Sequence, residues 1–272
     1  MSLNWINPND YVFNALLLME HFQIRLMFGT CGWMKNKSEW ISNMGIALNA
    51  NPAVKWYLAR RCPECASVIG EIAANGPAVA EAERIRAAEV FILGSVEDFT
   101  VHTTPEVMAV KCDYIRGWRK ERLYELVDLS GKTVLDVGAG SGRLTFAAAE
   151  KAAWVYASEP VGTMREFMRD KIILEGIPNI RVLDGFITRL PFPDHTFDAV
   201  ISGHVIGDDI DSETAEMERV CKPGGWLVDC VGDAEHAYFR RTEMTARGWE
   251  EIVYTGTFGY PVYNYRKQVN RR

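Results

Sequence analysis

The stretch Thr133-Val-Leu-Asp-Val-Gly-Ala-Gly-Ser-Gly-Arg143 decides the fold of this chain. A short apolar run that leads into three alternating glycines predicts a buried strand, a tight turn and the start of a helix. In such a turn the bare backbone can approach a ligand closely, and the free amides at the start of the helix can bind it. The stretch therefore predicts a site for a nucleoside-bearing cofactor.

The spacing of the glycines separates two kinds of cofactor. The fingerprint of dinucleotide-binding folds needs a third small residue at the position of Arg143, so that the helix can pack closely on the strand. An arginine there would disrupt this packing. The sequence therefore disfavours a nicotinamide cofactor and a dehydrogenase.

The pattern acidic-x-Gly-x-Gly-x-Gly, from Asp136 to Gly142, resembles the first motif of the class I S-adenosylmethionine-dependent methyltransferases. The segments that follow keep the order of that family, and they are 153–159, 180–186, 197–202, 219–229, 248–255 and 260–267. The resemblance covers residues 119–272. It implies S-adenosylmethionine as the cofactor and an α/β fold, a Rossmann-like sheet of seven mostly parallel strands with helices on both faces.

Acidic residues at the ends of successive predicted strands indicate how the cofactor is held. Glu159 ends an apolar run, where a carboxylate can accept both ribose hydroxyls. The resemblance implies that Asp184 holds the adenine amino group and that Phe186 flanks the ring. Asp136 could bond either the turn amides or the amino group of the cofactor. The other residues expected at the cofactor are Gly138, Ala139, Gly140, Pro160, Gly185 and Ser202.

These acids have a simpler interpretation, because single acids at strand ends usually face water. Their joint occurrence beside the glycine turn favours cofactor binding, since ligands of open α/β sheets bind at the carboxyl ends of the strands. Asp198, at the start of its predicted strand, is expected to be structural.

The loop 202–209 is where we expect the chemistry of transfer. Methyl transfer from a sulfonium needs the acceptor held in line, and it needs a base only if the acceptor must lose a proton. His204 has a suitable intrinsic pKa for that base; alternatively it closes the strand end or packs under the cofactor. The loop lacks the Asp/Asn-Pro-Pro-Tyr sequence of the amino-methylating branches, which disfavours adenine-N6 and glutamine as acceptors.

Residues 1–118 are predicted to form an all-α domain that caps the substrate, ahead of a methyltransferase domain at 119–272. Prolines that could begin helices stand at Asn7-Pro8, Asn51-Pro52, Gly76-Pro77 and Thr104-Pro105. A further helix is expected over 104–129, with a break near Gly117. Five of the eight tryptophans lie in this part, namely Trp5, Trp33, Trp40, Trp56 and Trp118. They either build its core or line a substrate pocket.

The pair Cys62-Pro-Glu-Cys65 has three interpretations: two buried thiols, a redox pair at a helix start, or half of a zinc site. Its remote partners in a zinc site could be Cys31, Cys112, His21 or His102. A structural zinc site usually shows a second close pair, and this sequence has none. The sequence alone therefore assigns no metal ligand.

Charge and hydropathy limit the cellular locations and the binding partners that we expect for this protein. The formal net charge is −6 and the pI is about 5.5, which gives no general attraction to nucleic acid. No apolar run is long enough for a membrane span, and no signal peptide is recognisable, so we expect a cytoplasmic protein with reduced cysteines. The sequence does not determine the oligomeric state.

The hypothesis from the sequence is a methyltransferase that acts on a small-molecule acceptor. Two alternatives stay open at this point. One is an RNA or protein methyltransferase whose N-terminal part is a metal-binding recognition module. The other is a non-catalytic protein that binds S-adenosylmethionine in order to regulate a partner.

Overall fold

The computed structural model describes residues 5–29, 36–77, 79–233, 235 and 239–270. The chain divides into two compact units, Met1–Met108 and Ala109–Arg272. This division falls earlier in the chain than the boundary expected after residue 118. Residues that follow Met108 join the second unit because they bond to it: Asp113 accepts a hydrogen bond from the Glu235 amide at 3.1 Å, and the Gly117 carbonyl accepts one from the Thr257 hydroxyl at 3.1 Å.

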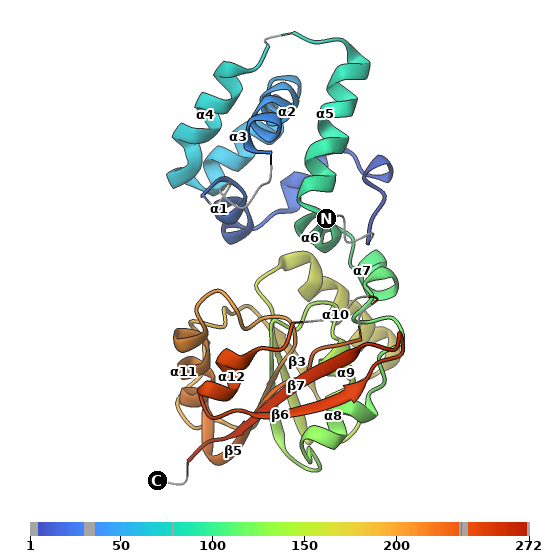
Figure 1. Cartoon of the computed structure of the whole chain (residues 1–272), viewed down its shortest axis with the longest axis vertical. Helices are drawn as coiled ribbons and strands as arrows, with labels where there is room; N and C mark the ends of the chain where they lie inside the picture. Colours follow the sequence, from blue (N-terminus) through green and yellow to red (C-terminus); the bar gives the residue numbers. More distant parts are fainter. Residues whose placement is uncertain (1–4, 30–35, 78, 234, 236–238, 271–272) are drawn as a thin grey trace. The chain divides into compact units, whose positions relative to one another are not determined.

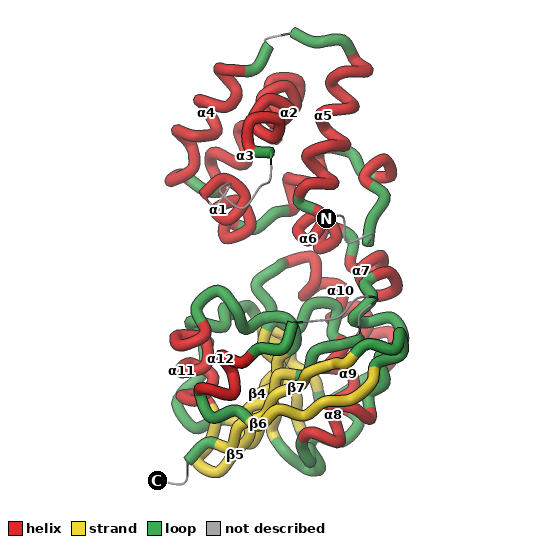
Figure 2. Tube along the Cα trace, viewed as in Figure 1, coloured by secondary structure: helices red, strands yellow, loops and turns green. Residues whose placement is uncertain are grey.

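The described residues of the first unit form helices joined by loops, with no strand among them, as Figures 1 and 2 show. Its α-helices are α1 (His21–Gly29), α2 (Lys37–Ala50), α3 (Pro52–Arg61), α4 (Ala66–Asn75), α5 (Ala82–Ser95) and α6 (Glu97–Thr100), and α7 (Pro105–Lys111) begins at its end. Short 3-10 turns are η1 (Pro8–Asp10), η2 (Phe13–Leu18), η4 (Pro63–Cys65) and η5 (Val101–Thr103). Pro8, Pro52 and Pro105 each begin a helix or turn, as predicted. The prediction for Pro77 was wrong, because the next helix begins only at Ala82.

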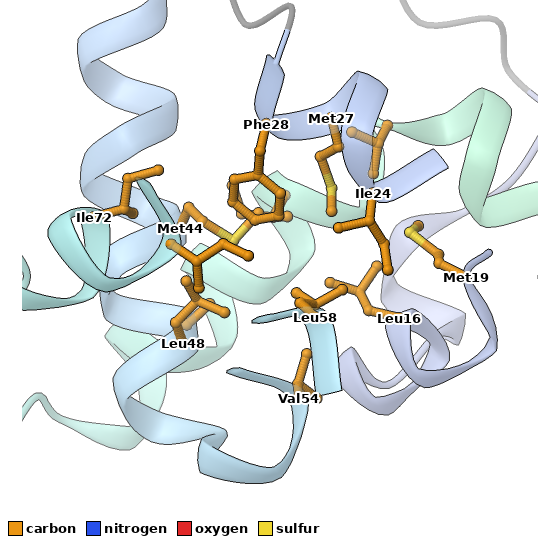
Figure 3. Packing of buried hydrophobic residues seen from close by; sticks show 14 of the residues in the cluster. Leu16, Met19, Ile24, Met27, Phe28, Met44, Leu48, Val54, Leu58 and Ile72 are labelled. Atoms are coloured by element: carbon orange, nitrogen blue, oxygen red, sulfur yellow. The ribbon is translucent and has the colours of Figure 1, made fainter. Parts of the chain in front are cut away.

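An apolar core holds these helices together (Figure 3). Leu16, Ile24, Met44 and Leu58 are fully buried in it. Among the tryptophans, Trp40 belongs to this core: it packs edge-on against Phe28 at a centroid distance of 5.8 Å, and its indole N–H donates to Ser95 Oγ at 2.9 Å. Trp56 is 64% exposed, Trp118 belongs to the second unit, and Trp33 lies outside the described residues.

The second unit is built on a seven-stranded sheet with the order β3-β2-β1-β4-β5-β7-β6. The strands are β1 (Thr133–Val137), β2 (Trp154–Ser158), β3 (Ile180–Leu183), β4 (Phe197–Ser202), β5 (Cys221–Asp229), β6 (Glu250–Thr255) and β7 (Pro261–Gln268). β1 to β5 pair in parallel, and β7 lies antiparallel between β5 and β6. The predicted seven-stranded, mostly parallel sheet is confirmed.

Helices cover both faces of this sheet, because alternate side chains of its buried strands point to opposite sides. Val134 packs toward α8 (Glu121–Leu126) and α9 (Arg143–Ala149), with α10 (Gly162–Glu175) on the same side. Its neighbour Leu135 packs in a second cluster with α11 (Ile210–Val220) and α12 (Thr242–Ala246). The helix expected over 104–129 is two helices, α7 and α8, separated by residues 112–120. In the described part of the chain, every helix is too short or too polar to cross a membrane.

Candidate active site

The glycine turn lies between β1 and α9, at the carboxyl edge of the sheet. Gly138, Gly140 and Gly142 have φ values of 65°, 57° and 90°, in the left-handed region that glycine favours. A Cβ on Gly138 would lie 2.4 Å from a Val205 methyl carbon, so no side chain fits there. The amides of Gly138 and Ala139 donate to the Ser158 carbonyl at 2.8 and 3.2 Å. The turn is therefore tied to the end of β2.

Glu159 completes this connection with its side chain. Its two carboxylate oxygens accept hydrogen bonds from the amides of Gly140 and Val161, both at 2.8 Å. The residue is 5% exposed, and burial raises the pKa of its carboxyl from 4.5 to about 7 in spite of these two bonds. Each carboxylate oxygen can accept a second bond. Glu159 thus keeps acceptor capacity beside the glycine turn, where the sequence predicts the ribose.

Asp136 lies beneath the turn and is 1% exposed. One of its oxygens accepts a hydrogen bond from the Thr145 hydroxyl of α9 at 2.5 Å. Burial raises the pKa of this carboxyl to about 7. The contact joins the end of β1 to α9, so Asp136 has a structural partner already; its contact with a cofactor stays a prediction.

The end of β3 presents the residues expected at the adenine. The Asp184 side chain is 73% exposed and lies 3.4 Å from Arg165 Nη1, while Phe186 is 41% exposed. Gly185 between them is closely approached, because a Cβ there would lie 2.3 Å from Ser158 Oγ. Asp184 and Phe186 are accessible to a ligand, and their contact with adenine stays a prediction.

Ser158 is a residue of this edge that the sequence analysis missed. Its hydroxyl is buried and has no hydrogen-bond partner among the described residues. It directly precedes Glu159 and Pro160. A buried hydroxyl without a partner costs free energy, which a ligand with a polar group could offset. Its only signal in the sequence was its place at the end of the second strand.

The loop after β4 brings Ser202 and His204 to different surroundings. Ser202 is fully buried, and its hydroxyl bonds toward β5, with the Val228 carbonyl at 3.4 Å and Asp229 Oδ1 at 3.3 Å. His204 has a φ of 65°, which is uncommon outside glycine. Its ring lies 4.5 Å from that of Tyr114, and its Nε2 accepts a long hydrogen bond of 3.4 Å from the Gly232 amide.

Comparison with known proteins bears on the class of this domain. Residues 135–229 match a family described as a methyltransferase domain. The chain is 33% identical to a demethylmenaquinone methyltransferase of Geobacillus stearothermophilus over 127 residues, which are 45% of this chain and 54% of the relative. It is 36% identical over 104 residues to a ubiquinone/menaquinone biosynthesis C-methyltransferase of Legionella pneumophila, covering 36% of this chain and 42% of the relative. This part of the chain is a class I S-adenosylmethionine-dependent methyltransferase domain.

The chain spans about half the length of the curated relatives it matches. Among solved structures, a methyltransferase from Aquifex aeolicus aligns with 61% of this chain and 96% of its own, at 19% identity and a TM-score of 0.49. S-adenosylmethionine is the cofactor of this class of domain. The glycine turn, the acceptor oxygens of Glu159 and the unpartnered Ser158 hydroxyl are suited to hold a nucleoside there.

Arg143, which argued against a dinucleotide, has a clear place in the methyltransferase domain. Its Nη2 donates to the Cys230 carbonyl at 2.8 Å, and its guanidinium lies 4.6 Å from the centre of the Trp118 ring. A Cβ on Gly203 would lie 2.5 Å from the same Nη2. The arginine thus fills the space between the loops after β4 and β5, and the sequence analysis missed this role.

A cavity of about 400 Å³ lies beside the loop after β4. Its lining residues are His204, Ile206, Gly207, Ile210, Val231, Phe239, Arg241, Glu243 and Tyr263. Arg241 is held in place by an ion pair of 3.1 Å with the fully buried Asp229, whose pKa burial raises to about 6. Most of the lining is apolar, and its polar side chains include those of His204, Arg241 and Glu243.

Proposed function

We propose that this protein transfers a methyl group from S-adenosylmethionine to a small molecule bound in the cavity beside His204. The position of the cavity carries the proposal. Val205 packs against Gly138 of the cofactor turn, while its neighbours His204 and Ile206 line the cavity. The loop that borders the glycine turn therefore also borders the cavity, and such neighbouring sites suit a reaction whose donor and acceptor must lie in line.

The cofactor in this proposal lies along the carboxyl edges of β1, β2 and β3. Glu159 accepts the ribose hydroxyls, Asp184 accepts from the adenine amino group, and Phe186 flanks the ring. The backbone from Gly138 to Gly140 approaches the cofactor where side chains would not fit. The cofactor's sulfonium supplies the electrophilic methyl group, and the protein has to orient the acceptor and exclude water.

His204 would take the proton of an acceptor that must lose one. It borders the cavity, and its ring is oriented by Tyr114 and by the Gly232 amide. A neutral ring that accepts at Nε2 carries its proton on Nδ1. Proton abstraction at Nε2 requires that the acceptor hydroxyl displace the bond from the Gly232 amide, which at 3.4 Å is long for a hydrogen bond.

The lining of the cavity suggests the class of acceptor. Ile206, Ile210, Val231, Phe239 and Tyr263 favour a flat apolar body, and a hydroxylated aromatic ring has that body together with an ionisable group. The named relatives act on demethylmenaquinone or in ubiquinone and menaquinone biosynthesis. We propose a hydroxylated aromatic acceptor of the quinol type.

The test is transfer of a labelled methyl group from S-adenosylmethionine by the full chain. The acceptors are reduced demethylated naphthoquinones of short side-chain length, a total RNA preparation and a protein mixture. We expect label in the quinol together with an equal amount of S-adenosylhomocysteine. Label in RNA or protein alone would support the recognition-module alternative. Tight binding of S-adenosylhomocysteine with no transfer to any acceptor would contradict catalysis and favour the regulatory alternative.

A further inference from the structure

Three side chains with metal-binding atoms meet in the helical first unit, and a fourth, Cys65, lies beside one of them. The Cys62 sulfur, a His21 ring nitrogen and a Glu64 carboxylate oxygen all lie within 4.8 Å of one another. The Cys65 sulfur lies 3.2 Å from that of Cys62, and His21 Nε2 lies 2.7 Å from the Glu64 carboxylate. His21 begins α1, while the other three belong to the connection between α3 and α4. The fold thus brings two distant segments to one point.

The local backbone explains why both sulfurs face the same place. Cys62 caps the end of α3, Pro63 opens the 3-10 turn η4, and the Cys65 amide donates to the Cys62 carbonyl at 3.0 Å. This tight turn brings the two cysteines of a C-x-x-C sequence together, a spacing that suits a single tetrahedral ion. The redox interpretation placed the pair at a helix start; in the structure Pro63 begins the 3-10 turn η4, and the α-helix α4 begins only at Ala66.

Burial divides the four side chains into an inner and an outer pair. Cys62 and Cys65 are 0% and 5% exposed, whereas the His21 and Glu64 side chains are 44% and 49% exposed. The two sulfurs therefore lie at the boundary of the apolar core, and the imidazole and the carboxylate lie on the solvent side of them. An ion could reach this point directly from water.

We propose that His21, Cys62, Glu64 and Cys65 bind one Zn²⁺ ion. Zinc takes thiolate, imidazole and carboxylate ligands in a tetrahedron, and bonds of about 2.0–2.3 Å give ligand separations of roughly 3.3–3.8 Å. The sulfurs of Cys62 and Cys65 lie 3.2 Å apart and His21 lies 2.7 Å from Glu64, both slightly closer than that range, so side-chain rotations are needed for all four to bind one ion. The two thiol protons leave to solvent as the ion binds. The ion would join the start of α1 to the α3–α4 connection.

The simpler explanation treats the pairs separately. An exposed histidine–glutamate pair contributes little to stability, and buried cysteines pack as small apolar side chains. That explanation accounts for each pair but not for their meeting at one point. Of the other partners considered from the sequence, His102 faces Gln23 at 3.3 Å, Cys112 belongs to the second unit, and Cys31 lies outside the described residues.

Metal analysis of the full chain, purified without chelator or affinity metal, tests the proposal. We expect about one zinc per chain by elemental mass spectrometry. Cobalt in place of zinc should give thiolate-to-cobalt charge-transfer absorption and the strong visible bands of a tetrahedral site. Neither readout depends on methyl transfer, so this inference stands or falls separately from the proposed function.

Matched variants assign the ligands. Cys62→Ser and Cys65→Ser should abolish stoichiometric zinc and the charge-transfer band, whereas Cys112→Ser, also at a buried cysteine, should keep both. Because serine in the core could prevent folding, the exposed pair gives a second set. His21→Gln and Glu64→Gln should remain folded by circular dichroism and weaken zinc binding by at least about tenfold, the scale seen even for outer-shell partners.

Three results would overturn the proposal. One is a folded wild-type chain that neither contains zinc nor binds added Zn²⁺. Another is full zinc content in both His21→Gln and Glu64→Gln. The third is a chain without zinc whose intact mass, in air, is two hydrogens lower and is restored by reductant, because that would make Cys62 and Cys65 a redox pair.

Discussion

Glu159→Gln gives the sharpest test of the cofactor site, because the change keeps the shape of the side chain and removes its charge. The wild-type carboxylate accepts from two backbone amides at 2.8 Å, and we propose that it also accepts from the ribose. The glutamine amide has one carbonyl oxygen, and its NH₂ group would face an N–H donor. We expect the variant to fold and to lose affinity for S-adenosylhomocysteine.

The magnitude follows from the bonds that are lost. A hydrogen bond to a charged group contributes about 1.5–3 kcal/mol, so the variant should bind roughly 10- to 100-fold more weakly at about pH 8. The pH dependence is more specific. Since burial raises the pKa of Glu159 to about 7, the carboxyl of the free protein is protonated below that pH, and a ligand that needs the ionised form binds more weakly there. Wild-type affinity should therefore be about 30-fold lower near pH 5.5 than near pH 8.

Isothermal calorimetry at several pH values measures both effects. Buffers with different ionisation enthalpies report the proton that Glu159 releases on binding. The control is Glu175→Gln, the same change at a half-exposed acid on α10 that pairs with Lys171. We expect the control to match the wild type, and Glu159→Gln to flatten the profile except for the part due to Asp136, whose pKa is also about 7. Equal affinities in wild type and Glu159→Gln across this range would refute the ribose assignment.

Three further predictions concern single positions. Gly138→Ala should destabilise the protein by about 1–3 kcal/mol more than Gly131→Ala in thermal or urea unfolding. Both glycines have positive φ, but only a side chain at Gly138 would meet Val205. Equal losses of unfolding free energy in the two variants would contradict the packing argument. His204→Ala should lower kcat by about 10²- to 10⁴-fold on an acceptor that loses a proton, while His195→Ala, at another histidine with positive φ, should not. Full turnover in His204→Ala would exclude an essential base. Ser158→Ala should leave the unfolding free energy of the ligand-free protein unchanged or slightly higher, since the hydroxyl has no described partner. The same variant should bind S-adenosylhomocysteine more weakly. Unchanged affinity would show that the cofactor does not use this hydroxyl.

Burial of acids at the carboxyl edge of the sheet has a consequence for stability. The pKa values of Glu159 and Asp136 are raised in the folded protein, so the folded state holds these protons more tightly than the unfolded state. The unfolding free energy should thus fall as pH rises from about 4.5 to about 7. A raised pKa of this size corresponds to about 3 kcal/mol for Glu159, and Glu159→Gln should remove that part of the slope in urea unfolding.

Local chemistry made several features predictable from the residues. The apolar run before Gly138 predicted a buried strand leading into a glycine turn, and the resemblance in the order of the later runs implied a sheet of seven mostly parallel strands. The helix starts at Pro8, Pro52 and Pro105 followed from the fixed φ of proline and its missing N–H. Pro77 shares those properties, but no helix begins there. Proline permits a helix start, and the packing of the following residues determines whether one forms.

Other features depended on distant contacts that no local pattern contains. The Ser202 hydroxyl is hydrogen-bonded to β5, and the Ser158 hydroxyl has no described partner. Arg143 fills the space between the loops after β4 and β5. None of these follows from residue type or spacing. The division after Met108 likewise reflects hydrogen bonds from Asp113 and Gly117 to residues far along the chain.

The sequence by itself determined the class of the catalytic domain, because the glycine turn and the strand-end acids encode backbone geometry and ligand chemistry within a few residues. Tertiary structure decided how the side chains are used. Folding buried Glu159 and raised its pKa, set His204 at the edge of a cavity, and brought His21 to Cys62 and Glu64. Desolvation and proximity arise only when distant segments pack together, and so these properties belong to the fold.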